Sequence, residues 1–239
     1  MPIKALIFDV DGTLAETEEL HRLSFNEAFA AAGLGWSWDQ ALYRELLGVT
    51  GGKERIAHFV AQNNPAALDR IAPMIPALHK DKTARYARLI ADGAIELRPG
   101  IARLIAEAHE TGVKLAIATT TSMPNVEALL AATLGRDALG WFAAIGAGDV
   151  VPAKKPAPDI YLWVLDRLAV PAVAAVAFED SRNGLLSATA AGLRTIVTPG
   201  LYTADADFSE AAVVVPDLSE SDGRPVTLAD IARWVESAR

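Results

Sequence analysis

The sequence contains no cysteine among its 239 residues. Disulfide bonds, catalytic thiolates and cysteine-ligated zinc sites are therefore excluded, which fits a reducing compartment. No apolar run reaches the roughly 18 residues that a membrane-spanning helix needs. The first residues, Met1-Pro2-Ile3-Lys4, lead straight into a strand-like segment without the layout of a signal peptide. We therefore expect a cytoplasmic protein with no membrane partner.

Positive charge is also scarce. The 22 Lys and Arg residues face 30 Asp and Glu residues, which gives a formal net charge of -8 at pH 7. Nucleic acids and anionic membranes select for clusters of excess cationic residues, so we expect neither as a partner. A small anionic substrate would instead need positive charge that is concentrated at one site.

Short apolar, β-branched runs alternate with segments of helical periodicity over most of the chain. Strand-like runs stand at 5–8, 114–118, 174–178 and 195–197, with weaker ones at 142–145 and 213–215. Helical patterns between them cover 101–111, 124–134, 158–168 and 182–191. Strands that alternate with helices predict an α/β fold, in which helices cover both faces of a parallel sheet.

This alternation stops between Glu16 and Ile95. Amphipathic helical patterns fill 18–32, 38–47, 52–62 and 65–91 there, and Asn63-Asn64-Pro65 separates the last two. Arg98-Pro99-Gly100 marks the return to the α/β pattern. We therefore expect two domains. Residues 1–15 and 96–239 would form an α/β core domain, and residues 16–95 would form a helical domain inserted after the first strand.

Two acidic motifs follow predicted strands. Asp9-Val10-Asp11-Gly12-Thr13 comes directly after the first strand, and Glu179-Asp180 follows the run at 174–178. In open α/β sheets, ligands bind at the edge formed by the carboxyl ends of the strands. Carboxylates that converge there repel one another unless a hard cation such as Mg²⁺ neutralises them. An Asp-Gly turn and acidic residues at a helix start are alternatives that need no metal.

Hydroxyl groups and lysines form the next two motifs. Thr119-Thr120-Thr121-Ser122 ends a strand-like run before a helix, where hydroxyls and free amides suit a phosphate oxygen. Helix capping alone would also explain these residues. Lys154 and Lys155 stand in a loop whose prolines restrict the backbone. One lysine pointing inward would offset the charge of a phosphate, whereas two solvated lysines would need no ligand.

These four motifs, in this order, resemble those of the haloacid-dehalogenase superfamily, whose fold is a Rossmann-like core with a helical cap. The resemblance implies that Asp9 is the nucleophile that forms an aspartyl-phosphate. It implies that Asp11 is the general acid/base and contributes its carbonyl to the metal site. The implied phosphate-binding residues are Thr119, Thr120 and Lys155, and the implied Mg²⁺ ligands are Asp9, Asp11, Glu179 and Asp180.

A finer resemblance is to the group that holds β-phosphoglucomutase and the CbbY phosphatases. It looks most like the latter, which act on xylulose 1,5-bisphosphate. The likeness lies in Glu16-Thr17-Glu18-Glu19-Leu20-His21, in Thr50-Gly51-Gly52-Lys53-Glu54-Arg55 and in the segment 155–161. The Gly-Gly-Lys-Glu-Arg segment also has the composition of an anion-binding helix start, suited to a second phosphate. The expected substrate-binding residues are Glu16, Glu18, His21, Gly51, Gly52, Lys53, Arg55 and Lys80.

Several alternatives remain open at this level. Lys53, Arg55 and Lys80 would also suit a solvated helix face, and His21 a structural position. A mutase would use the same core residues but pass the phosphoryl group to a second sugar hydroxyl. A catalytically silent module would only bind a phosphorylated metabolite. We expect a monomeric phosphatase whose partner is a small phosphorylated sugar.

Overall fold

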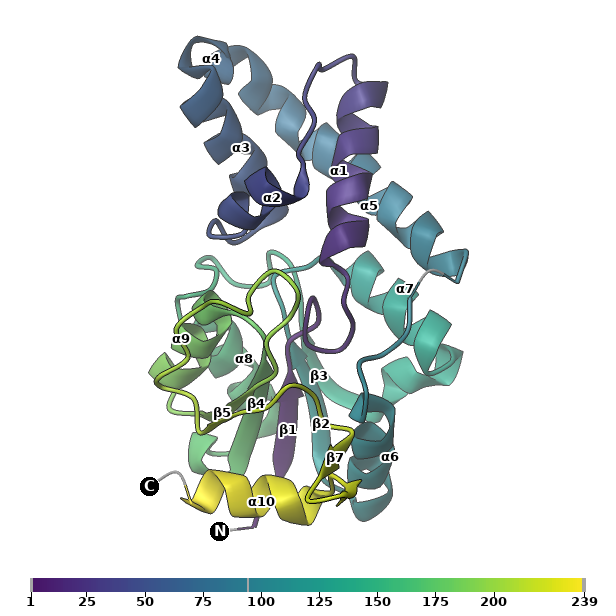
Figure 1. Cartoon of the computed structure of the whole chain (residues 1–239), viewed down its shortest axis with the longest axis vertical. Coiled ribbons are helices and arrows are strands. Elements are labelled where there is room, and N and C mark those ends of the chain that lie inside the picture. Colours follow the sequence, from purple (N-terminus) through teal and green to yellow (C-terminus); the bar gives the residue numbers. More distant parts are fainter. Residues whose placement is uncertain (1, 94, 238–239) are drawn as a thin grey trace.

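A six-stranded parallel sheet forms the centre of the molecule, in the strand order β3-β2-β1-β4-β5-β6 (Figure 1). The computed structural model describes residues 2–93 and 95–237. The strands are β1 (Ala5–Phe8), β2 (Lys114–Ala118), β3 (Phe142–Gly146), β4 (Ala175–Glu179), β5 (Arg194–Val197) and β6 (Val213–Val214). This sheet confirms the predicted α/β fold. A separate antiparallel pair is formed by β7 (Glu220–Ser221) and β8 (Arg224–Pro225).

Helices cover both faces of this sheet. They are α6 (Ile101–Thr111), α7 (Met123–Thr133), α8 (Asp159–Leu168), α9 (Arg182–Ala190) and α10 (Leu228–Ser237). Because side chains alternate along a strand, Leu6 and Phe8 pack with α6, α7 and α10, whereas Ala5 and Ile7 pack with α8 and α9. The α8 side of the sheet is rich in alanine, so that these helices approach it closely.

The remaining helices lie beyond the carboxyl ends of the strands, at the top of Figure 1. They are α1 (Glu18–Ala31), α2 (Gln40–Leu46), α3 (Gly52–Asn63), α4 (Leu68–Ile71) and α5 (Ile75–Ala91). We call α1–α5 the cap. An aromatic cluster that includes Phe25, Phe29, Trp38 and Tyr43 fills its interior.

The single helix predicted over 65–91 is wrong in its first half. The chain there forms a 3₁₀ turn at Pro65–Ala67, the short helix α4, a second 3₁₀ turn at Ala72–Met74 and only then α5. Pro73 and Pro76 explain the break, because neither can donate the backbone hydrogen bond that a continuous helix requires at its position.

The two chain segments that join the cap to the sheet run side by side. Ala15 and Leu97 form an antiparallel bridge, and the amide of Arg98 donates to the carbonyl of Leu14 at 2.8 Å. The chain therefore enters and leaves the cap at one place. No helix within residues 2–93 and 95–237 is long and apolar enough to cross a membrane.

Candidate active site

The sheet brings the predicted motifs to one edge. Phe8 pairs with Ile117 on one side and with Phe178 on the other, so β1, β2 and β4 end at the same level. Asp9 and Thr119, which follow these strands, are both buried. Above them lies a cleft that is lined by core residues and by residues of the cap helices α1, α3 and α5. Thr119, Thr120, Lys155 and Asp180 all line it.

Lys155, which lines this cleft, connects two carboxylates. Its Nζ lies 2.6 Å from Oδ1 of Asp9 and 2.6 Å from Oε1 of Glu179. The Tyr161 hydroxyl donates to the same Glu179 oxygen at 2.5 Å. Burial alone would lower the pKa of Lys155, but the two carboxylates hold that pKa above its usual value. Lys154 points elsewhere and pairs with Asp149 at 2.7 Å, so one lysine of the two faces the site.

Asp9, Glu179 and Asp180 form a buried carboxylate cluster, and one oxygen from each lies within 4.8 Å of the others. Burial, together with nearby negative charge, raises the pKa of Asp9 to about 8 and that of Asp180 well above its usual range. The second oxygen of Glu179, Oε2, is buried without a hydrogen-bond partner. Once ionised, the three carboxylates carry more negative charge than Lys155 alone can neutralise. An all-oxygen donor set of this charge fits a hard divalent cation such as Mg²⁺.

Gly12 allows the loop after β1 to approach this cluster. Its φ of +83° is one that glycine adopts without strain, and a Cβ at this position would lie 2.2 Å from Oδ2 of Asp180. The Arg98 guanidinium binds the Gly12 carbonyl and also donates to the carbonyl of Thr198 at 2.7 Å. The Asp11-Gly12 turn is therefore fixed both by close packing and by hydrogen bonds.

The Asp11 carboxylate faces the cap rather than the carboxylate cluster. Its Oδ1 accepts from the Thr17 hydroxyl at 2.6 Å and lies 2.8 Å from Nε2 of His21. Burial alone would raise the pKa of Asp11, but the His21 charge and these hydrogen bonds hold that pKa well below its usual value. On its other side, the His21 ring is 2.5 Å from Nζ of Lys82 and stacks on Tyr86.

Two further cap residues, Glu18 and Arg55, line the cleft and are linked by hydrogen bonds to the Tyr43 hydroxyl. Glu18 Oε2 accepts from the Tyr43 hydroxyl at 2.7 Å, and Nη1 of Arg55 donates to that hydroxyl at 3.1 Å. The Arg55 guanidinium also lies over the Tyr43 ring. Gly51 and Gly52 line the same cleft at the start of α3.

Three of the predicted substrate-binding residues lie outside this cleft. Glu16 is exposed and pairs with Arg98 at 3.4 Å. Lys53 pairs with Asp149 and lines a neighbouring hollow. Lys80 is exposed on α5. Lys80 is exposed because of helical spacing, since the buried face of α5 carries positions 75, 78, 82, 86 and 90.

Other residues in the cleft belong to none of the motifs. They are Phe25, Leu47, His79, Lys82, Asn125 and Thr203. Lys82 is almost fully buried, and burial lowers its pKa to about 7, against the opposing effect of the Asp11 charge. Lys82 could be found from the sequence, since it falls on the apolar stripe of α5. Thr203 could not, because it lies in an irregular loop.

Comparison with known proteins places this geometry in a family. A model of the haloacid dehalogenase-like hydrolases matches residues 3–192. The chain is 55% identical to the protein CbbY of Cereibacter sphaeroides, over 92% of this chain and 95% of that one.

Solved structures agree with the sequence comparison. CbbY from Rhodobacter sphaeroides in complex with phosphate has a TM-score of 0.89 and 53% sequence identity, and covers 96% of this chain and 99% of its own. A variant of that protein in complex with xylulose 1,5-bisphosphate has a TM-score of 0.88 and 53% identity, over 95% and 98% of the two chains. The chain belongs to the haloacid dehalogenase-like hydrolase family.

Proposed function

We propose that the protein is a Mg²⁺-dependent phosphatase that hydrolyses xylulose 1,5-bisphosphate through an aspartyl-phosphate on Asp9. The observation that carries this proposal is the buried contact of Lys155 with Asp9 and Glu179 beside Asp180. The solved relative that binds xylulose 1,5-bisphosphate, at 53% identity, supports the choice of substrate.

Charge neutralisation is the first requirement of the reaction. A phosphate ester dianion repels an attacking carboxylate, and both must be brought together in one buried site. The Lys155 ammonium group already contacts Asp9 and would meet the incoming phosphoryl oxygens as well. Asp9, Glu179, Asp180 and the Asp11 carbonyl would hold Mg²⁺, which supplies Lewis-acid charge stabilisation when bound.

The covalent steps use Asp9 and Asp11. An Asp9 oxygen attacks phosphorus, the bond from phosphorus to the sugar oxygen breaks, and Asp11 gives its proton to that oxygen. Water then attacks the aspartyl-phosphate and transfers a proton to Asp11, which releases inorganic phosphate and restores the Asp9 carboxylate. Thr17 and His21 hold Asp11 for both transfers.

Asp11 must change its protonation state during this cycle. The contacts that lower its pKa favour the ionised form, which suits the second step. The negative charge of a bound substrate opposes this effect, because a like charge raises the pKa of a carboxyl group. Substrate binding thereby favours the protonated form that the first step needs.

The second phosphate of a bisphosphate would bind at the start of α3. Gly51 and Gly52 line the cleft there, and the amides at a helix start attract anions. Arg55 lies one turn along the same helix and also lines the cleft. Lys53 would join them only after leaving Asp149.

A substrate panel tests this proposal. The purified protein is incubated with Mg²⁺ and a set of sugar mono- and bisphosphates, among them xylulose 1,5-bisphosphate and ribulose 1,5-bisphosphate, and released phosphate is measured. We expect a large preference for the former and no turnover after chelation of the metal. Isomerised sugar without phosphate release would establish a mutase. Tight binding without turnover of any ester would establish a silent binding module.

The nucleophile is tested by Asp9→Asn. We expect turnover to vanish while substrate binding stays measurable, because the substitution keeps the shape of the site. Retention of about a tenth of the wild-type rate would exclude covalent catalysis at Asp9, since loss of an essential nucleophile costs far more than tenfold. Asp166→Asn is the matched control, because this carboxylate is exposed on α8 and lies outside the cluster.

A further inference from the structure

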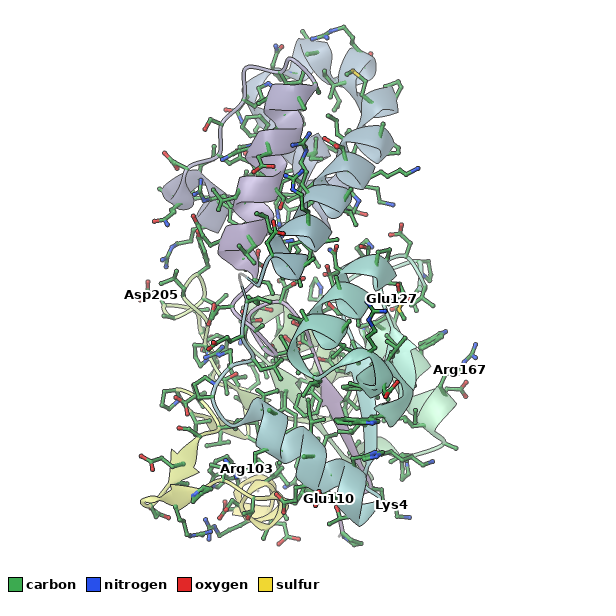
Figure 2. All side chains as sticks on the ribbon, turned by 90° about the vertical axis from the view of Figure 1, so that its right-hand side faces the viewer. Lys4, Arg103, Glu110, Glu127, Arg167 and Asp205 are labelled. Atoms are coloured by element: carbon green, nitrogen blue, oxygen red, sulfur yellow. The ribbon has the colours of Figure 1, made fainter. Side chains whose placement is uncertain are left out.

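A loop of the core reaches into the cap. Residues Gly200–Asp205, which we call the strap, lie between β5 and β6 in the sequence. In Figure 2 the labelled Asp205 marks the strap just below the cap helices. Tyr202, at its centre, is only 7% exposed and belongs to the aromatic cluster inside the cap, although it comes from the core part of the chain.

Tyr202 is held by three kinds of contact. Its ring packs edge-on against Tyr43, with 5.6 Å between ring centroids. Its hydroxyl donates to Oε2 of Glu19 at 2.5 Å, and Arg22 donates to the same carboxylate. The Arg44 guanidinium lies 5.7 Å from the centre of the Tyr202 ring. A buried tyrosine whose hydroxyl makes a hydrogen bond is an effective anchor between two packed surfaces.

The other residues of the strap strengthen this connection. Arg44 of α2 donates to the carbonyl of Leu201 at 3.2 Å and pairs with Asp205 at 3.4 Å. On the core side, the Thr203 hydroxyl donates to Oδ2 of Asp180 at 3.4 Å and accepts from the Gly200 amide at 2.8 Å. Neighbouring residues of one loop thus contact the cap interior and the carboxylate cluster.

Tyr43 links Tyr202 to residues that line the cleft. The Tyr43 hydroxyl bonds both Glu18 and Arg55, and both of these side chains line the cleft. The Tyr43 ring lies between the Tyr202 ring and the Arg55 guanidinium in this chain of contacts. A shift of Tyr202 would therefore displace Glu18 and Arg55, two cap side chains that line the cleft.

We propose that Tyr202 is a positioning residue that sets Glu18 and Arg55 in the closed cleft and so determines selectivity for sugar bisphosphates. This inference rests on the proposed function of the site. Tyr202 itself touches no reacting group. Its effect falls on substrates long enough to reach Glu18 and Arg55, whereas a small phosphate ester needs only the residues that hold the phosphoryl group and Asp11.

The test compares two substrates in three variants. Values of kcat and KM are measured for xylulose 1,5-bisphosphate and for p-nitrophenyl phosphate, which has no second phosphate. Tyr202→Ala removes the anchor, and Tyr202→Phe removes only the hydroxyl bond to Glu19. Leu201→Ala is the matched control, because Leu201 lies in the same loop and is 63% exposed.

We expect Tyr202→Ala to lower kcat/KM for the bisphosphate by about tenfold to a hundredfold, since misplaced binding groups cost this much. Its kcat/KM for p-nitrophenyl phosphate should stay within about twofold of the wild-type value. Tyr202→Phe should cause a smaller loss of the same selectivity, and Leu201→Ala none. An equal fall for both substrates would show a merely structural role and overturn the proposal, as would no change in either.

Two controls keep the result interpretable. Thermal unfolding of each variant shows whether it is folded at the assay temperature, and Tyr202→Phe carries the test if Tyr202→Ala is not. If wild-type protein does not hydrolyse xylulose 1,5-bisphosphate, the proposed substrate is wrong. The strap is then tested with the best sugar phosphate of the panel, and an unchanged preference for it over p-nitrophenyl phosphate in both Tyr202 variants refutes the role of Tyr202.

Discussion

Magnesium binding should depend steeply on pH, because the cation must displace protons from the carboxylate cluster. Burial raises the pKa of Asp9 to about 8 in the metal-free protein. With that pKa, Asp9 is about 1% ionised at about pH 6 and about half ionised at about pH 8. Since Mg²⁺ binds the ionised form, its affinity should rise about fiftyfold over this range, or about 2 kcal/mol. Protons leaving Asp180, whose pKa is also raised, would add to the effect.

Isothermal titration calorimetry of the metal-free protein measures this directly. Mg²⁺ is titrated at about pH 6, 7 and 8, in buffers with different ionisation enthalpies, which count the protons released. We expect the Kd to fall as pH rises and about one proton or more to be released at neutral pH. Asp9→Asn should flatten the pH dependence, whereas Asp149→Asn should preserve it. A wild-type Kd that is constant over this range, with no proton release, would refute the reasoning.

The raised pKa of Asp9 also predicts how the free energy of unfolding of the metal-free protein depends on pH. The pKa of Asp9 is higher in the folded chain than in the unfolded chain, so its contribution to the free energy of unfolding is fully present below the usual carboxyl pKa of 3.8. That contribution is lost as the pH rises through about 8. The melting temperature of the metal-free protein should therefore fall over this range, and Mg²⁺ should raise it most at the alkaline end.

Four substitutions give further predictions. Gly12→Ala should lower kcat by about a hundredfold or more, because its φ of +83° and the nearby Asp180 oxygen leave no place for a Cβ, and steady-state kinetics measure this. Lys155→Met should abolish turnover and lower the free energy of unfolding in metal-free urea titrations by about 3–5 kcal/mol, with partial recovery in Mg²⁺. Lys53→Ala should raise KM for bisphosphates more than for monophosphates, and Asp149→Ala, which frees Lys53, should lower KM for bisphosphates. Equal effects on both substrate classes would contradict a remote phosphate site.

The sheet and the motifs at its edge could be predicted from the sequence, because both follow from short local patterns. Apolar runs such as 115–118 form buried strands, and the residues that follow parallel strands meet at one edge. Asp9, Thr119 and Asp180 could therefore be predicted to converge before any contact was known. The short strands β7 and β8 carry no comparable pattern. The helix α10 is absent from the predicted elements although its segment is amphipathic, with Ile231 and Val235 on its buried face.

The cap was harder to predict, because its function depends on which side of each helix faces the cleft. Lys80 and Lys82 differ by about 200° around α5 at 3.6 residues per turn, and the lysine on the apolar stripe is the one that reaches His21. Contacts between distant parts of the chain, such as Arg98 with Gly12 or Tyr202 with Glu19, leave no periodic signal. They arise only when the fold is complete.

The bridge between Ala15 and Leu97 has an evolutionary consequence. Because an antiparallel pair holds its backbones about 5 Å apart, everything between these two residues could be shortened, lengthened or exchanged without moving a strand of the sheet. New specificity could then arise in the inserted helices by sequence drift or recombination, while the carboxylate cluster and Lys155 stayed in place below them, provided that the contacts of Thr17 and His21 with Asp11 were kept.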